Sequence, residues 1–188
     1  MWDRNNWQPL CTAHHSAKTA AQDGRWGVNL NAIPTVEPSR IPVTLVCGPP
    51  GSGKSRYAQQ HAGPRDLVID LDTIRSELSG TAWYRSEDRW IRPALQRRNE
   101  MLAALSRDTT HERAWLIVSA PKASDRREWR NRLGNVQVVV MAVDVEVCIE
   151  RIGRDERRSD RVQEFSAAVH RWWTRYVADP ADEVVLRG

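Results

Sequence analysis

The residues with the clearest chemical meaning run from Cys47 to Ser55, which read CGPPGSGKS and fit the pattern G-x-x-x-x-G-K-[S/T]. An apolar, β-branched run precedes them (IPVTLVC, residues 41–47), and RYAQQH follows at residues 56–61. The loop is therefore expected to join a buried strand to a helix, so that glycines and the helix N-terminus offer N–H groups to phosphate oxygens. We expect Lys54 to bind the β- and γ-phosphates of a nucleoside triphosphate and the Ser55 hydroxyl to bind magnesium. The expected nucleotide-binding residues are Gly48, Pro49, Pro50, Gly51, Ser52, Gly53, Lys54 and Ser55.

Two carboxylates and an arginine follow the second predicted strand, LVIDL at residues 67–71. Asp70 and Asp72 lie at its C-terminal end, where ligand sites of parallel α/β sheets form, and Arg75 follows Asp72 by one helical turn. A phosphate-binding loop, a strand and then D-x-x-R resemble the P-loop kinases of the polynucleotide kinase, gluconate kinase and zeta toxin type. The resemblance implies that Asp72 accepts the proton of an attacking hydroxyl and that Arg75 binds the substrate. The structural alternative makes Asp72 a helix cap and Arg75 its solvated partner.

The third predicted strand, AWLIVS at residues 114–119, continues into Ala120 and Pro121. Many P-loop enzymes place an aspartate there for magnesium, so the sequence departs from their pattern at this point. Mg²⁺ is expected on Ser55, with Asp70 or Asp72 helping through water. ATP is the expected cofactor because the resembling kinases use it, whereas the loop itself binds phosphates and not bases.

Four arginines near the C-terminus are spaced three, four and three residues apart, namely Arg151, Arg154, Arg158 and Arg161. On one continuous helix they would share a face. In the resembling kinases a lid at this place carries arginines onto the transferred phosphate, which implies Arg154 and Arg158 as catalytic residues. The alternative is a solvated helix in which neighbouring acidic residues pair with the arginines.

Three further segments leave a ligand-binding and a structural interpretation open. Arg98 interrupts the apolar stripe of a helix predicted at residues 90–108, and it either binds substrate near the phosphate site or snorkels at the helix edge. The aromatic residues of the loop GTAWYRSEDR, residues 80–89, either stack on a base or sugar or close the edge of the core. The arginine-rich helix predicted at residues 125–133 is expected to be a solvated face, with a polyanion-binding patch as the alternative.

Residues 6–19, NWQPLCTAHHSAKT, resemble the second half of an HNH nuclease motif, N-L-x-x-L-C-x-x-C-H-x-x-K-T. Cys11 and His14 fall where that family has its second pair of zinc ligands, and His15 falls where it has its last histidine. The family's general base and first Cys-x-x-Cys pair have no counterpart here, and a structural Zn²⁺ site needs four ligands. The segment is interpreted as a relic, a truncated nuclease or a piece completed by a partner nuclease chain; a chance polar leader is the alternative.

Strands and helices alternate from residue 41 onward, which predicts an α/β fold with a parallel sheet of about five strands covered on both faces. This is the three-layer sandwich of a P-loop NTPase. Residues 1–40 are expected to form an irregular N-terminal extension with a linker, and residues 41–188 the kinase-like domain.

The composition bounds the class of protein and its partners. With 40% hydrophobic and 28% charged residues, the 188-residue chain fits one soluble domain, and it has no apolar run long enough for a membrane span. Three distant cysteines argue against a disulfide framework and favour the cytoplasm. The net charge of +4, carried almost entirely by arginine, fits nucleotides or nucleic acid as partners, although a coding bias toward arginine is an equal alternative.

The leading functional hypothesis is ATP-dependent transfer of a γ-phosphate to a hydroxyl of a nucleic-acid 5′ end, a nucleotide or a small metabolite. The first alternative is a nucleotide-binding or ATPase subunit of a nucleic-acid-processing complex of a phage or mobile element. The weaker alternative is a fragment of an HNH-type nuclease.

Overall fold

The computed structural model describes residues 32–156 and 161–186. The chain divides into the units Met1–Ala32 and Ile33–Gly188, and the fold described here is that of the second unit. Its first residues already pack on the domain, since the Ser39 amide donates to the Leu133 carbonyl and the Arg40 amide to the Leu105 carbonyl. The HNH-like segment, with Cys11, His14 and His15, and the predicted lid residue Arg158 lie outside the described residues.

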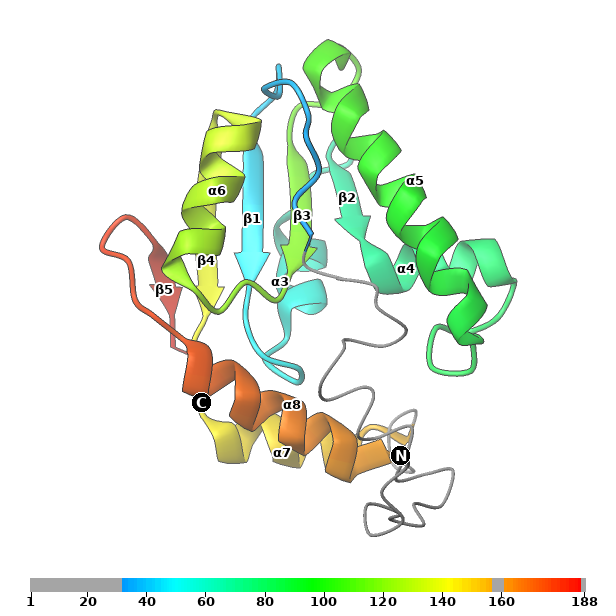
Figure 1. The fold of residues 1–188 in the computed structure, drawn as a ribbon, viewed down its shortest axis with the longest axis vertical. Coiled ribbons are helices and arrows are strands. Elements are labelled where there is room, and N and C mark those ends of the chain that lie inside the picture. Colours follow the sequence, from blue (N-terminus) through cyan, green and yellow to red (C-terminus); the bar gives the residue numbers. More distant parts are fainter. Residues whose placement is uncertain (1–31, 157–160, 187–188) are drawn as a thin grey trace, which may run out of the picture. The chain divides into compact units, whose positions relative to one another are not determined.

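A five-stranded, all-parallel sheet forms the centre of the domain, in the order β2-β3-β1-β4-β5 (Figure 1). This confirms the predicted α/β class. The strands are β1 (Val43–Cys47), β2 (Leu67–Asp70), β3 (Ala114–Val118), β4 (Val136–Met141) and β5 (Glu183–Val185).

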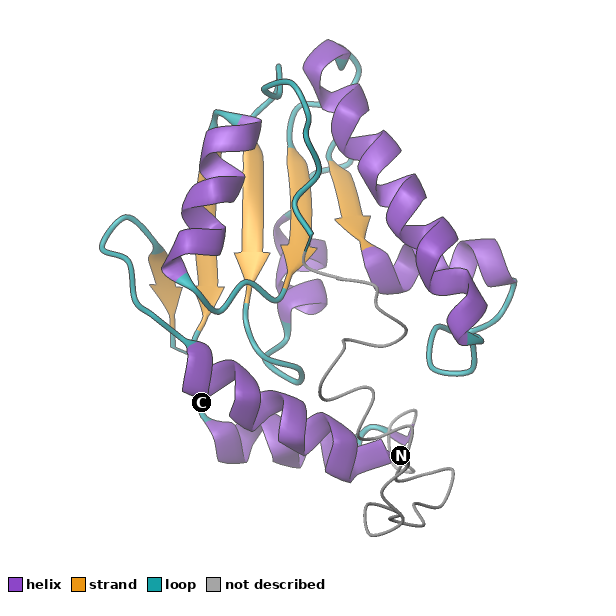
Figure 2. Cartoon of the chain, in the orientation of Figure 1, coloured by secondary structure: helices purple, strands orange, loops and turns teal. Residues whose placement is uncertain are grey.

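Helices cover both faces of the sheet (Figure 2). On one face, α5 (Ile91–Ala104) and α6 (Ala123–Leu133) pack on the larger core cluster, which includes Leu45 and Leu116. On the other face, α3 (Lys54–His61) packs on a cluster that includes Val46 and Ile117. Consecutive strand residues thus point into different apolar layers, which explains why the strand sequences are continuously hydrophobic.

The remaining elements gather at the ends of the strands. The second β-strand runs directly into α4 (Leu71–Ser79), and the short helices η2 (Asp88–Trp90) and η3 (Leu105–Arg107) flank α5. A third core cluster joins α7 (Val145–Arg154) to α8 (Val162–Arg175) through Cys148, Ile152 and Val169. Among the described residues, no helix is long and apolar enough to cross a membrane.

Two details correct or confirm the expected helices. The predicted stripe of α5 is confirmed, since Ile91, Ala94, Leu95, Arg98 and Leu102 are its buried residues. The prediction of a single helix with four arginines on one face is wrong: α7 ends at Arg154, because Asp155 is extended, and Arg161 is the N-cap of the separate helix α8.

The loop before β3 is closed by the Asp108 carboxylate. Its Oδ1 accepts hydrogen bonds from the backbone amides of Thr110 (2.8 Å) and His111 (3.1 Å), and its Oδ2 lies 2.7 Å from Nδ1 of His111. Burial of Asp108 opposes ionisation, but these hydrogen bonds outweigh it and hold the pKa of the carboxyl well below its usual range.

We expect Asp108→Asn to reduce the free energy of unfolding at neutral pH. An unfolded aspartate has a pKa of about 3.9, so the stabilisation from ionised Asp108 is fully present above that pH and is lost as pH falls toward the folded-state pKa. Urea denaturation of the wild type and Asp108→Asn at pH 7 and pH 3 measures the free energy of unfolding. The difference between the two proteins should therefore be smaller at pH 3 than at pH 7. A difference that stays constant would contradict the role given to this charge.

Candidate functional site

The glycine-rich loop between β1 and α3 has the backbone of a phosphate cradle. Gly53 is the N-cap of α3 in a left-handed conformation, with φ of 89°. Gly51 also has a positive φ, 78°, and a Cβ there would lie 2.5 Å from the carbonyl oxygen of Cys148 in α7. The loop therefore needs glycine at its tip both for its conformation and for its contact with α7.

Two side chains of the loop converge on one carbonyl oxygen. The Ser52 hydroxyl donates to the Pro49 carbonyl at 2.8 Å, and the Lys54 ammonium donates to the same oxygen at 2.7 Å. Lys54 is thus already directed into the curve of the loop. Phosphate binding would exchange its bond with the carbonyl for bonds to anionic oxygens, which are stronger acceptors.

The buried Asp70 carboxylate, 8% exposed, joins the phosphate loop to the helix that follows β2. Its Oδ2 accepts a hydrogen bond of 2.7 Å from the Ser55 hydroxyl at the start of α3. Its Oδ1 accepts one of 3.1 Å from the backbone amide of Asp72, which makes Asp70 the N-cap of α4. The structural alternative that Asp72 caps this helix is therefore wrong.

These oxygens suit the magnesium ion that the loop implies. Mg²⁺ prefers hard oxygen ligands and is usually held by one or two protein groups together with substrate phosphates. Ser55 Oγ and Asp70 Oδ2 would provide that protein share, directly or through water. In the part of the chain that the structure describes, no group of three or more His, Cys, Asp or Glu side chains could hold a metal without such phosphates.

The predicted acceptor-side residues lie on α4, beyond this pair. Asp72 is exposed in the first turn of the helix. Arg75 is buried, so it is not the solvated partner of Asp72, and its guanidinium holds the loop that follows α4. Nε donates to Ser86 Oγ at 3.1 Å, and Nη2 donates to the Ser86 carbonyl and to Asp88 Oδ1, the last at 3.3 Å.

Aromatic rings and arginine side chains in contact with one another connect the loop after α4 to α8. The Trp83 ring meets Tyr84 edge-on at 5.9 Å and Phe165 of α8 edge-on at 6.1 Å between ring centroids. Arg85 lies 5.7 Å over the Tyr84 ring, and Arg161 lies 5.4 Å over the Phe165 ring. The aromatic residues therefore connect the loop after α4 to α8, and the sequence offered no sign that Phe165 takes part in this contact.

The other cations predicted for the site lie in different surroundings. Arg154 Nη2 pairs with Glu150 Oε1 at 2.5 Å on the exposed side of α7 and lines an open hollow of about 530 Å³ with Arg151, Asp155 and Glu156. Arg98 is 3% exposed and donates to Asn99 Oδ1 at 3.2 and 2.9 Å, so the expectation that it snorkels is wrong. Burial lowers the pKa of its guanidinium. Its role toward substrate stays a prediction.

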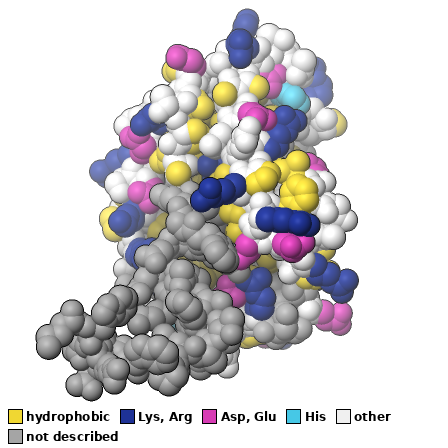
Figure 3. All heavy atoms as spheres, turned by 45° about the vertical axis from the view of Figure 1, so that its right-hand side comes forward, with side chains coloured by type: hydrophobic (Ala, Val, Ile, Leu, Met, Phe, Trp, Pro, Cys, Tyr) yellow, Lys and Arg dark blue, Asp and Glu magenta, His cyan; other side chains and the backbone are white. Residues whose placement is uncertain are grey.

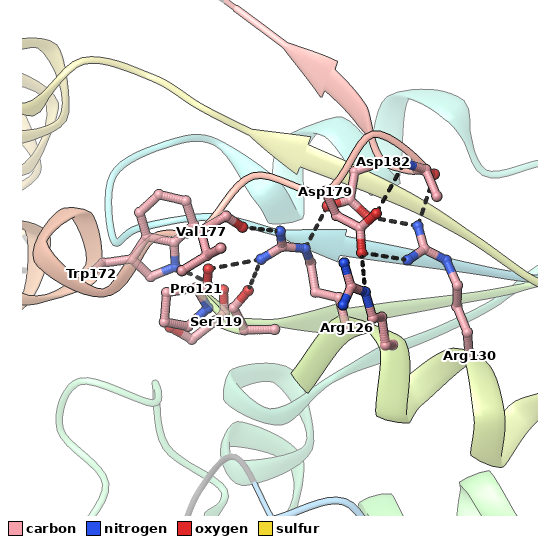
Figure 4. Close-up of polar contacts among 11 residues, drawn as sticks. Ser119, Pro121, Arg126, Arg130, Trp172, Val177, Asp179 and Asp182 are labelled. Atoms are coloured by element: carbon pink, nitrogen blue, oxygen red, sulfur yellow. Dashed lines mark hydrogen bonds and ion pairs between the residues drawn. The ribbon is translucent and has the colours of Figure 1, made fainter. Parts of the chain in front are cut away.

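The basic helix α6 is only in part the expected solvated face, since Arg127 is exposed whereas Arg126 is buried. Arg126 is fully buried and paired with Asp182, and Arg130 and Arg127 pair with Asp182 and Asp179 (Figure 4). The hydrogen bonds from the Ala181 amide and Arg127 hold the pKa of Asp179 below its usual range. On the face drawn in Figure 3, basic and acidic side chains are interspersed. Because Arg126, Arg127 and Arg130 are paired with aspartates, α6 gives no support to a polyanion-binding patch.

The two described cysteines are structural. Burial raises the pKa of Cys47 to about 12 and that of Cys148 to about 11, and both thiols are free. A nucleophilic cysteine needs a lowered pKa. Covalent catalysis through either thiol is therefore not supported.

Comparisons with known proteins bear on the family and on the fold. A family model described as an AAA domain matches residues 43–180. The fold is similar to that in the Pnkp1/Rnl/Hen1 RNA repair complex, with a TM-score of 0.51 and 13% identity over 78% of this chain and 49% of that chain. It is also similar to a shikimate kinase from Acinetobacter baumannii in complex with shikimate, with a TM-score of 0.49 and 17% identity over 80% of this chain and 84% of that chain.

A gluconokinase from Sinorhizobium meliloti 1021 is similar as well, with a TM-score of 0.45 and 19% identity over 77% of this chain and 82% of that chain. At such identities the likeness concerns the fold alone. No protein of the curated set matches the sequence significantly. The HNH resemblance finds no support in these comparisons, and the family match begins after that segment.

The glycine-rich loop, the five-stranded parallel sheet and the family match over residues 43–180 together establish that this chain belongs to the AAA domain family of P-loop proteins.

Proposed function

We propose that the chain is an ATP-dependent phosphotransferase that moves the γ-phosphate to a hydroxyl acceptor. The observation that carries this proposal is the Asp70 carboxylate, which binds Ser55 beside the phosphate loop and the Asp72 amide at the start of α4. The loop that would hold the donor and the helix that would hold the acceptor are thereby fixed to one side chain.

In this proposal the phosphate loop, Lys54 and Asp72 each have a defined role. Backbone N–H groups of residues 51–55 bind the phosphates, and Lys54 neutralises charge on the β- and γ-phosphates. Asp72 accepts the acceptor's hydroxyl proton while that oxygen attacks the γ-phosphorus and ADP leaves with the electrons of the broken bond. Magnesium, when bound, offsets the negative charge that develops on the phosphate oxygens.

Arg75 supports the acceptor side by a route other than the one expected from the sequence. Its guanidinium fixes Ser86 and Asp88, so it shapes the loop that carries Trp83. In this proposal Trp83 and Phe165 form one wall of the acceptor site and exclude water, which would otherwise compete for the phosphoryl group. Direct contact of Arg75 with the acceptor stays a prediction, as does the role of Arg154.

The alternative of a subunit that only binds nucleotide rested on the missing aspartate after β3 and on the partial HNH segment. Asp70 supplies a carboxylate from the neighbouring strand, at 2.7 Å from the Ser55 hydroxyl. The lack of an acid after β3 therefore no longer favours a subunit without catalysis. Nucleic acid as the acceptor, and a nuclease as partner chain, stay hypotheses that rest on the sequence.

We expect Asp72→Asn to abolish most transfer while leaving ATP binding nearly unchanged. Removing a general base typically lowers turnover by about 10²- to 10⁴-fold. The measurement is transfer of label from γ-labelled ATP to 5′-hydroxyl DNA and RNA oligonucleotides, nucleosides, nucleotides and sugars. Glu77→Gln, on the same helix and also exposed, is the matched control and should behave like the wild type. Failure of the wild type to label any acceptor class, despite binding ATP, would overturn the proposal.

Trp83→Ala should raise the KM for the acceptor and leave the KM for ATP unchanged, because the Trp83 ring contacts Phe165 of α8, on the acceptor side in this proposal. The loss of aromatic contacts corresponds to an increase of about three- to tenfold. Trp83→Phe keeps an aromatic ring, so its KM for the acceptor should be close to that of the wild type. Steady-state kinetics with the acceptor found above will measure both constants, and equal changes in both would rule out an acceptor-side role.

A further inference from the structure

The turn after β3, Ser119 to Pro121, is hydrogen-bonded to the beginning of the phosphate loop. The Ser119 carbonyl accepts from the backbone amide of Gly48 at 3.3 Å. The same oxygen accepts from Nε1 of Trp172 in α8 at 2.8 Å. Because Gly48 is the first glycine of the loop, the position of this carbonyl helps to decide where the loop begins.

The middle residue of the turn has an unfavourable backbone conformation. Ala120 has φ of 35° and is the one non-glycine residue with positive φ among the described parts of the chain. It is also buried, at 3% exposure. A side chain with a Cβ persists in this region only when its surroundings hold it there.

Arg126 holds this turn from α6 (Figure 4). Its Nη1 donates to the carbonyls of Ala120 at 2.9 Å and Pro121 at 2.8 Å, so one nitrogen bridges two consecutive carbonyl groups of the turn. Its Nη2 donates to the Val177 carbonyl at 2.6 Å, and its Nε donates to Asp182 at 2.7 Å.

Arg126 is itself fixed in place. Its side chain and that of Asp182 are both 0% exposed, and Arg130 donates to the other Asp182 oxygen at 2.6 Å. The guanidinium also lies 5.5 Å over the Tyr176 ring, which stacks on Trp172 with centroids 5.0 Å apart. The two groups that hold the turn, Arg126 and Trp172, are thus linked through Tyr176.

We infer that Arg126 is a positioning residue for nucleotide binding, which acts through the turn after β3 on the phosphate loop. A buried ion pair is weak evidence for stability, since apolar residues of similar volume often serve as well. The planar fork of arginine, in contrast, can hold two carbonyl groups at fixed positions. Without it, Ala120 can relax toward an ordinary φ, and the Ser119 carbonyl then moves away from the Gly48 amide.

This inference rests on nucleotide binding by the phosphate loop, which is one part of the proposed function, and not on transfer to an acceptor. It predicts a selective effect. Loosening the entry to the loop weakens binding of ATP, whereas α4, with Asp72, is held by the separate contact through Asp70. The KM for ATP should therefore rise while the KM for the acceptor stays constant.

The test uses Arg126→Met with Arg132→Met as the matched control, because Arg132 lies on the same helix and pairs with Glu128 at the surface. Calorimetric titration with ATP and magnesium should show binding to Arg126→Met that is weaker by roughly tenfold, the scale of coupling between contacting elements. Arg126→Lys keeps the charge but lacks the planar fork, so its affinity for ATP should lie between those of Arg126→Met and the wild type. Arg132→Met should bind like the wild type.

Trp172→Phe provides a second route to the same result if Arg126→Met does not fold. It removes the indole donor to Ser119 and keeps a ring for stacking on Tyr176. We expect weaker ATP binding and faster hydrogen exchange at the Gly48 amide in this variant. Wild-type affinity in a folded Arg126→Met, or in Trp172→Phe if the former is unfolded, overturns the inference. Wild-type protein that binds ATP but labels no acceptor contradicts the proposed function and leaves this inference intact.

Discussion

The Asp70 carboxylate is the contact on which the arrangement of the site depends. One oxygen binds the Ser55 hydroxyl at 2.7 Å, and the other binds the amide that begins α4 at 3.1 Å. Because the group is buried and both of its oxygens are used, it has little freedom to move. The spacing between the phosphate loop and Asp72 is consequently set by one side chain at the end of β2.

This contact places a carboxylate beside Ser55 although no acid follows β3. The sheet order places β2 directly beside β3, so a carboxylate at the end of β2 can reach Ser55 across the sheet edge. The turn after β3 serves a different purpose, since its carbonyl groups accept hydrogen bonds from the Gly48 amide, Trp172 and Arg126. The neighbouring strand ends thus provide a side-chain oxygen for the expected magnesium and backbone oxygens that support the loop.

Much of the fold could be predicted because its signals are local. The glycine pattern of residues 48–55 and the continuously apolar strands each lie within a few residues, and the parallel sheet follows from their alternation with helices. Asp70 or Asp72 was expected to help Ser55 to hold magnesium, because both lie where ligand sites of parallel sheets form. The sequence did not predict the hydrogen bond between Ser55 and Asp70.

The contacts that the sequence did not predict join residues that are distant along the chain. The neighbours of Arg126 in α6 suggest a solvated side chain, yet its partner Asp182 lies 56 residues further along the chain. Substrate binding by Arg75 stays a prediction, whereas its bond to Ser86, 11 residues on, lies in a loop without a secondary-structure signal and was not predicted. Likewise, the spacing of the four arginines suggested one helix, and the extended Asp155 interrupts it.

The most direct test of the central claim is the magnesium dependence of ATP binding in Asp70→Asn. Asparagine is also a good N-cap, so α4 is preserved while the charge beside Ser55 is removed. Titration calorimetry with and without magnesium should show that the ion tightens ATP binding to the wild type and to the control Asp125→Asn. In Asp70→Asn we expect most of that gain to be lost, by about tenfold or more, with binding of ATP alone unchanged. An undiminished effect of magnesium in Asp70→Asn would contradict the account.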